Sequence, residues 1–384
     1  MISRNTKLLL NFKKDSTWIL ILYILHPKDI LKSLIFFRGF AIFFIVLGHC
    51  LGFGQQLNSS ISSDILKNRY AHLIGYEEMI VCGGTAFFVF ISGFLFYNVF
   101  YIRGFDYKKF IKGKIKNVFS PYLIMVFFLY MAASFNGTKF ENSSVIIHNL
   151  FFAGAFWYIP FIMTVFICSP IYLKFIETTK KKQMIILAIC LIYSISTTRH
   201  DHNPVLSMMF WSIFYLFGIF IAKNYEKFKL LIKKDCTCYC IALLAFLTFV
   251  IAWRFDNRFL INGGTWDFRI TPNLSVAIKI AFCSFFLYAS LCLEGSNNIF
   301  LSVIKIFLSV LAKYSFSIYF FHIIIFYYLW SNRLIFENFC VHLSGFEMHF
   351  FIYGLAIGIC SVCSGLACII KKIFGKYSRA LIGS

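Results

Sequence analysis

Residues 38–50 read RGFAIFFIVLGHC and lie in the first long apolar run of the chain. A helix turns about 100° per residue, so Arg38 and His49, eleven residues apart, lie within roughly 20° of one face. About 16 Å separates them along the axis, which puts Arg38 near one membrane surface and His49 well inside. Ionisable side chains at such depth are usually functional. The alternative is an arginine that reaches lipid phosphates and a histidine satisfied by a neighbouring helix.

The composition of the whole chain indicates a membrane protein. Of its 384 residues, 60% are hydrophobic and 14% are charged, and the mean hydropathy is +0.77. A soluble core cannot hold that much apolar surface. Because backbone hydrogen bonds must be satisfied internally in lipid, the long apolar runs are expected to be helices, and they lack the alternation of barrel strands. The sequence therefore predicts an all-α polytopic membrane protein.

About ten transmembrane helices are expected from the apolar runs. Their approximate ranges are 34–54, 79–100, 118–136, 150–173, 184–198, 205–222, 239–253, 274–293, 310–330 and 349–370. Residues 299–311 are either a surface helix or an early start of the ninth span, so nine or eleven spans stay open. The expected division is an interfacial lead-in (1–33), a transmembrane domain (34–370) and a basic cytoplasmic tail (371–384).

The basic residues predict the orientation. With the N-terminus inside, the inner segments hold most of the 37 lysines and arginines, as the positive-inside rule requires. Both termini are therefore expected in the cytoplasm. The net charge of +21 is then explained by inner loops that face anionic lipid, and no nucleic-acid partner is expected.

No motif for a soluble type of active site occurs in the chain. A glycine-rich phosphate loop, HExxH and a nucleophile elbow are all absent from the sequence. The cluster Arg199, His200, Asp201 and His202 contains metal-ligand types but is interpreted as a solvated loop, and no metal is expected. The chemistry must then lie in the membrane bundle and its short loops.

Four blocks resemble, in the same order, the integral-membrane acyltransferase type 3 family. They are RGFAIFFIVLGHC (38–50), GGTAFFVFISGFLF (83–96), FWYIPFIM (156–163) and KYSFSIYFFH (313–322). The resemblance implies a ten-helix bundle that transfers acyl groups, usually acetyl from acetyl-CoA, to sugars of surface polysaccharides, lipids or glycosylated metabolites.

The resemblance also implies roles for residues in these blocks. Arg38 and Lys114 are expected to bind CoA, and Arg38 and His49 to be catalytic, with His49 as the general base or the acyl carrier. Substrate-binding or supporting roles are expected for Ser92, Trp157, Tyr319 and His322. The alternatives are close helix packing at Ser92 and Gly93, an outer aromatic belt at Trp157 and a satisfied interior histidine at His322.

One segment departs from the family pattern. The family tends to carry two arginines three residues apart before a proline, whereas residues 114–122 read KIKNVFSPY, with Lys114 and Asn117 at those positions. Asparagine cannot replace a guanidinium fork, so a second CoA contact at Asn117 is in doubt. Lys112 or Lys116 is a candidate to compensate, and ordinary positive-inside charge is the alternative.

The expected function is a bacterial inner-membrane O-acyltransferase. It would move acetyl from cytoplasmic acetyl-CoA to a hydroxyl of a cell-surface glycan such as an O-antigen, capsule or exopolysaccharide, with membrane lipid and a glycan or glycolipid acceptor as partners. The alternative is a non-acylating glycan-assembly protein, a polymerase or a flippase. The modest outer loops disfavour a polymerase, and the scarcity of charged residues along the helices disfavours a flippase.

Overall fold

The computed structural model describes residues 28–59, 81, 84–135, 156–197, 203–232, 275–340 and 342–383. Regular structure within these ranges is helical, and no strand occurs in them. The all-α prediction is thus confirmed for the described part of the chain. The seventh expected span (239–253), residues 1–27 of the lead-in and the cluster at residues 199–202 lie outside it.

The helices follow the apolar runs, and several of them begin at capping residues. Asn203 caps α12 through hydrogen bonds from the Val205 and Leu206 amides, and Ser344 forms a capping box with Glu347 at the start of α19. The helices in order are α3 (Lys28–Ser59), α5 (Gly84–Leu95), η1 (Phe96–Tyr101), α6 (Tyr107–Lys114), η2 (Ile115–Phe119), α7 (Ser120–Phe135), α9 (Tyr158–Ile167), α10 (Ser169–Glu177), α11 (Lys180–Ser196), α12 (Pro204–Lys223), α13 (Tyr225–Ile232), α16 (Ser275–Gly295), α17 (Ile299–Ser331), α18 (Arg333–Cys340), α19 (Gly345–Phe374), η3 (Gly375–Tyr377) and α20 (Ser378–Ile382).

Six described helical segments are long and apolar enough to cross a membrane. They are Ser33–Gly54, Gly84–Tyr101, Pro204–Lys223, Val276–Gly295, Ile299–Ser331 and Phe346–Ile382, and they coincide with six of the expected spans. The bent pair α9 and α10, with an angle of 56° between its members, gives a seventh if it counts as one span. A multi-pass membrane protein is therefore supported. The count of about ten and the cytoplasmic termini stay predictions.

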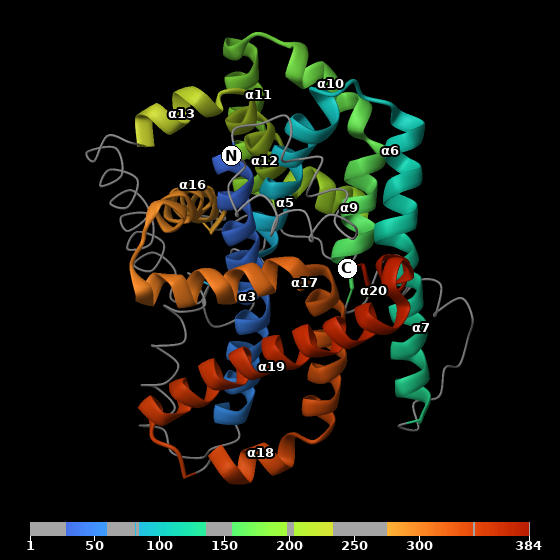
Figure 1. Ribbon diagram of the computed structural model, residues 1–384, viewed down its shortest axis with the longest axis vertical. Coiled ribbons are helices and arrows are strands. Elements are labelled where there is room, and N and C mark those ends of the chain that lie inside the picture. The colour runs from blue at the N-terminus through green and yellow to red at the C-terminus, as the bar shows by residue number, and fades with distance from the viewer. Residues whose placement is uncertain are drawn as a thin grey trace, which may run out of the picture.

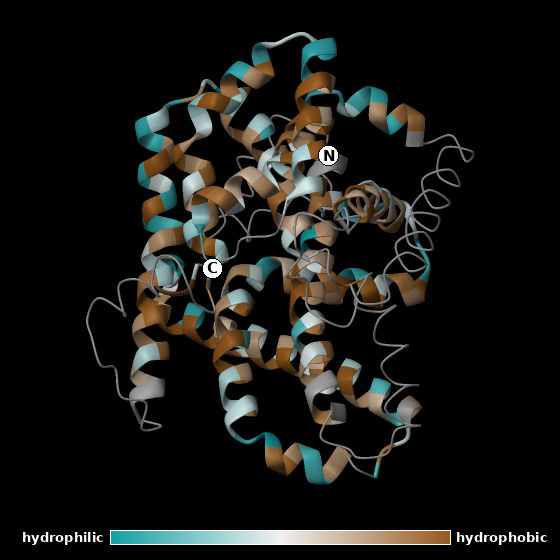
Figure 2. Ribbon diagram, turned by 180° about the vertical axis from the view of Figure 1, so that it is seen from behind, coloured by the Kyte–Doolittle hydropathy of each residue, from teal (hydrophilic) through white to brown (hydrophobic). Residues whose placement is uncertain are grey.

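Three of the basic segments expected on the inner side lie towards one end of the molecule. Helix α6, the turn between α10 and α11, and α13 lie towards the top of Figure 1, and α18 lies at the opposite end. Seen from behind in Figure 2, both ends carry hydrophilic residues and the helices between them are largely hydrophobic. This arrangement agrees with a membrane zone between two polar ends.

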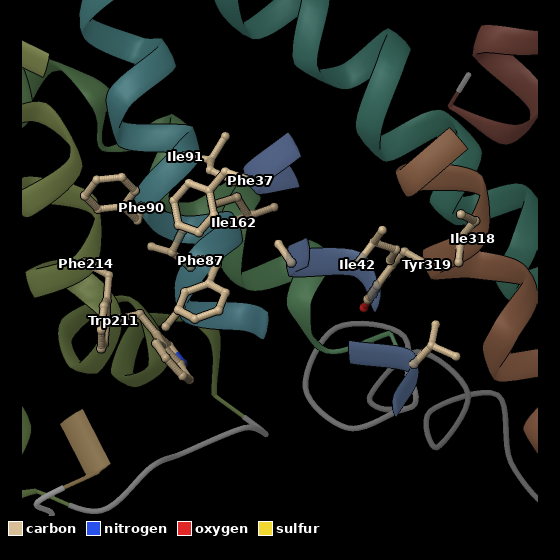
Figure 3. Close-up of a cluster of buried hydrophobic side chains, with 14 of the residues drawn as sticks. Phe37, Ile42, Phe87, Phe90, Ile91, Ile162, Trp211, Phe214, Ile318 and Tyr319 are labelled. Carbon is tan, nitrogen blue, oxygen red and sulfur yellow. The ribbon is translucent and has the colours of Figure 1, made fainter. Parts of the chain in front are cut away.

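Helix α3 packs against α5, α16, α17 and α19. Phe37 of α3 lies 5.4 Å from Phe87 and 5.8 Å from Phe90, both on α5, between ring centroids. Figure 3 shows this group with Trp211 and Phe214 of α12. The first apolar run thus forms part of the aromatic core and holds Arg38 and His49 in place.

Helices α5 and α12 approach so closely that only glycine fits at their crossing. A Cβ atom at Gly93 would collide with the carbonyl oxygen of Tyr215, and one at Gly218 would collide with that of Phe90. These reciprocal contacts join backbones without side chains between them, as is common where membrane helices associate. Gly93 therefore has the packing role expected of it.

Helices α3 and α17 run in the same direction where they meet. Along α3, Arg38 contacts Ser315, His49 contacts His322, and Phe53 lies 5.3 Å from Trp330, between ring centroids. Residues 299–311 are thus an early start of the ninth expected helix, and Figure 1 shows α17 changing direction along its length. Two parallel spans require an odd number of crossings between them, which agrees with the seven expected.

Candidate functional site

The first part of the candidate site is built around Arg38. Its Nε donates a 2.6 Å hydrogen bond to the Ser315 hydroxyl on α17, and the side chain is half-buried. This bond fixes the guanidinium at the junction of α3 and α17. The eleven-residue spacing puts His49 on the same side of α3, and both side chains do contact α17.

Lys114 is held by aromatic rings close to Arg38. Its Nζ lies 4.1 Å from the ring centroid of Phe166, 5.1 Å from that of Phe110 and 5.2 Å from that of Phe100. Burial among these rings, together with the positive charges of Arg379 and Arg38, lowers the pKa of Lys114 to about 8. Lys114 therefore lies within electrostatic reach of two other cations. The structure places the two expected CoA-binding residues together.

Asn117 does not supply a cation and is engaged within its own helix. Its Nδ2 donates a 2.8 Å hydrogen bond to the carbonyl of Gly113. Lys112 and Lys116 are exposed, and the charges that lower the pKa of Lys114 are those of Arg379 and Arg38. Arg379 is thus a further cation whose charge reaches Lys114, and the sequence did not point to it.

The second part of the site is a pair of histidines. The ring centroids of His49 and His322 lie 5.2 Å apart, and that of Phe326 lies 5.5 Å from His49. His49 is exposed, whereas His322 is fully buried. His322 Nδ1 lies 2.9 Å from the Ile318 carbonyl, which can only accept, so Nδ1 carries the proton. Its Nε2 is buried without a hydrogen-bond partner in the described structure and is left as an acceptor.

Tyrosines join the two parts. The Tyr158 side chain interacts electrostatically with Arg38 and shares a hydrogen bond with Ser92. Its ring centroid lies 5.7 Å from that of Tyr319, which lies 5.8 Å from that of His322. A continuous row of polar and aromatic side chains therefore runs from Arg38 to His49. We call it the site row: Arg38, Tyr158, Tyr319, His322 and His49.

Tyr158 is a site residue that sequence reasoning missed, although its block had been singled out for its neighbour Trp157. The Trp157 ring stacks on those of Phe161, at 6.1 Å, and Trp211, at 6.4 Å between centroids. Trp157 and Tyr158 are consecutive residues at the start of α9, so their side chains point in different directions. Tyr158 therefore meets the site, whereas Trp157 packs in the aromatic core. Only contact with α17 distinguishes them.

The arrangement can hold a polyanion at one part and perform proton transfer at the other. Arg38, Lys114 and Arg379 repel one another, and a bound polyanion would offset that repulsion. Among the described residues, no group of three or more His, Cys, Asp or Glu side chains is placed to hold a metal ion.

Comparisons with known proteins match nearly the whole chain. A family model described as an acyltransferase domain, that of the acyltransferase type 3 family, matches residues 31–369. A protein of Staphylococcus aureus strain MRSA252, named a probable poly-beta-1,6-N-acetyl-D-glucosamine export protein, is 24% identical over 357 residues, which cover 86% of this chain and 92% of the relative. The protein of the same name from strain MSSA476 is 23% identical with the same coverage. No solved structure matches the chain.

Proposed function

Because the chain belongs to the acyltransferase type 3 family, we propose that it moves acetyl from cytoplasmic acetyl-CoA to a hydroxyl of a cell-surface glycan. The observation that carries the proposal is the site row, which links a cluster of cations to a histidine pair. Arg38 and His49 lie about 16 Å apart along α3, a reach of the order of the pantetheine arm of CoA. The phosphates and the thioester would then meet different parts of one site.

Arg38 and Lys114 would bind the phosphates of the donor. CoA is a polyanion, and cations already held by Ser315 and by aromatic rings need little reordering to bind it. Lysine meets a phosphate as a point charge, whereas the planar guanidinium of arginine can bind two oxygens at once. The donor would enter from the end at which α6 and the turn between α10 and α11 lie (Figure 1).

His49 would act as the general base. It would take the proton from the acceptor hydroxyl as the oxygen attacks the thioester carbonyl, and the departing CoA sulfur would recover a proton as the carbon–sulfur bond breaks. His322 can position His49, because its Nε2 is available to accept a hydrogen bond while Nδ1 is tied to the backbone. In the alternative route His49 itself carries the acetyl group and passes it to the hydroxyl.

The acceptor is proposed to be a glycan or glycolipid at the inner membrane of a bacterium. The names of these relatives refer to poly-beta-1,6-N-acetyl-D-glucosamine, which favours an amino-sugar polymer as the acceptor class. Their description as export proteins also favours a second candidate function, glycan export without acylation. The two differ in whether the host glycan carries an O-acetyl group that depends on this chain.

The O-acetyl content of the host surface polysaccharide, measured by proton NMR, tests the proposal. Strains lacking the chain, or carrying His49→Ala at matched protein level, are expected to lose one acetyl signal. His342→Ala is the control, since His342 is exposed and outside the site row. An unchanged acetyl pattern with glycan retained in the cells would refute acylation and favour export.

A further inference from the structure

The C-terminal helix α20 is held between α7 and α17 by two side-chain hydrogen bonds to its backbone. The Ser120 hydroxyl of α7 donates to the Ala380 carbonyl at 3.4 Å, and the Ser317 hydroxyl of α17 donates to the Ile382 carbonyl at 2.9 Å. Gly383 follows with a φ of +76°, and a Cβ there would collide with the Phe316 ring. Figure 1 shows α20 beside α7.

This docking brings Arg379 to the donor-binding cations. Arg379 precedes Ala380, whose carbonyl is bound by Ser120, six residues after Lys114. On the other side, Ser317 lies two residues after the Ser315 that holds Arg38. The charge of Arg379 acts on both Arg38 and Lys114. Its own side chain is exposed and so accessible to a ligand.

We propose that Arg379 is a third phosphate-binding residue of the donor site and forms a cluster of cations with Arg38 and Lys114. The inference rests on the proposed CoA donor. A ligand of several negative charges would offset the mutual repulsion of these three cations, and the phosphates of CoA provide such charges. A guanidinium adds the two-oxygen contact that Lys114 cannot make and that Asn117, bonded to Gly113, does not offer.

The affinity of the purified full-length protein for CoA and for pantetheine, measured by isothermal titration calorimetry, tests this role. Arg379→Gln should weaken CoA binding by about 10-fold, as expected for loss of one charge-assisted contact, and Arg379→Lys should weaken it less. Pantetheine lacks the phosphates, so its affinity should be the same for wild type and Arg379→Gln. Lys376→Gln is the matched control, because Lys376 is an exposed cation three residues away that lies over Tyr377 at 5.3 Å.

The outcomes distinguish failure of the role of Arg379 from failure of the proposed CoA donor. If wild type binds CoA and Arg379→Gln binds it as tightly as Lys376→Gln does, the role of Arg379 is refuted while the CoA donor stands. Equal losses for CoA and pantetheine would also refute it, because a phosphate contact cannot act on pantetheine. If wild type binds no CoA, the proposed function falls and the role of Arg379 falls with it.

Discussion

Lys114 and Lys112 offer a matched test of whether the basic inner segment binds a donor or only follows the positive-inside rule. Both lie on α6, but Lys114 is packed among Phe100, Phe110 and Phe166, whereas Lys112 is exposed. The substitutions Lys114→Gln and Lys112→Gln remove the same charge from the same helix. Only the first is expected to weaken CoA binding, because only Lys114 is held beside Arg38.

The size of the loss follows from the charge interaction. A phosphate about 4 Å from an ammonium gains about 4 kcal/mol at an effective dielectric of 20. Solvent and salt screening at a half-buried site reduce this to about 1–2 kcal/mol, so Lys114→Gln should weaken CoA binding about 5–30-fold. Calorimetric titration of purified protein in low and in high salt measures the factor and its screening.

A comparable loss in Lys112→Gln would refute the assignment. Such a result would mean that the site responds to the net charge of the inner face and not to the position of Lys114. Equal affinity of wild type and Lys114→Gln for CoA would refute it as well.

Three further predictions follow from the contacts. The affinity for CoA should fall as the pH rises above about 8, because the pKa of Lys114 is lowered to about 8 and its charged form binds phosphate. In Lys114→Arg the affinity should change much less over this pH range, because arginine stays charged. Gly93→Ala should lower stability by about 1–3 kcal/mol because its Cβ meets the backbone of α12, whereas Gly113→Ala, with open space around it, should not, as thermal unfolding would show. Ser315→Ala should raise the KM for acetyl-CoA about 10-fold with little change in kcat, because it frees the guanidinium of Arg38; an unchanged KM would contradict that role.

The sequence predicted most of the described fold because the main determinant is local. Apolar runs of membrane-spanning length form helices in lipid whatever their neighbours are. The sequence was less informative where the path of a helix depends on contacts with other helices. The expected fourth span, for example, is a pair of helices, α9 and α10, bent by 56° at Cys168. The expected basic tail includes α20, which docks onto α7 and α17 through side-chain bonds to backbone carbonyls.

The candidate site shows the same division. Helical spacing sufficed to put Arg38 and His49 on one face, because that relation lies within one helix. Pairing of His49 with His322, some 270 residues later, depends on how α3 and α17 pack. The same packing selects Tyr158 over Trp157, and it brings in Arg379, whose charge in the sequence looks like any other inner-face cation. The spacing of residues within a single helix does not predict these contacts between helices.

The most direct measurement is acetyl transfer by the purified protein in proteoliposomes. The assay supplies acetyl-labelled acetyl-CoA and a glycan acceptor, and it follows label in the glycan together with release of the CoA thiol. We expect wild type to transfer label and His49→Ala to transfer it at least about 100-fold more slowly while still binding CoA. Transfer by His49→Ala at the wild-type rate would contradict the assignment of the reaction to the histidine pair.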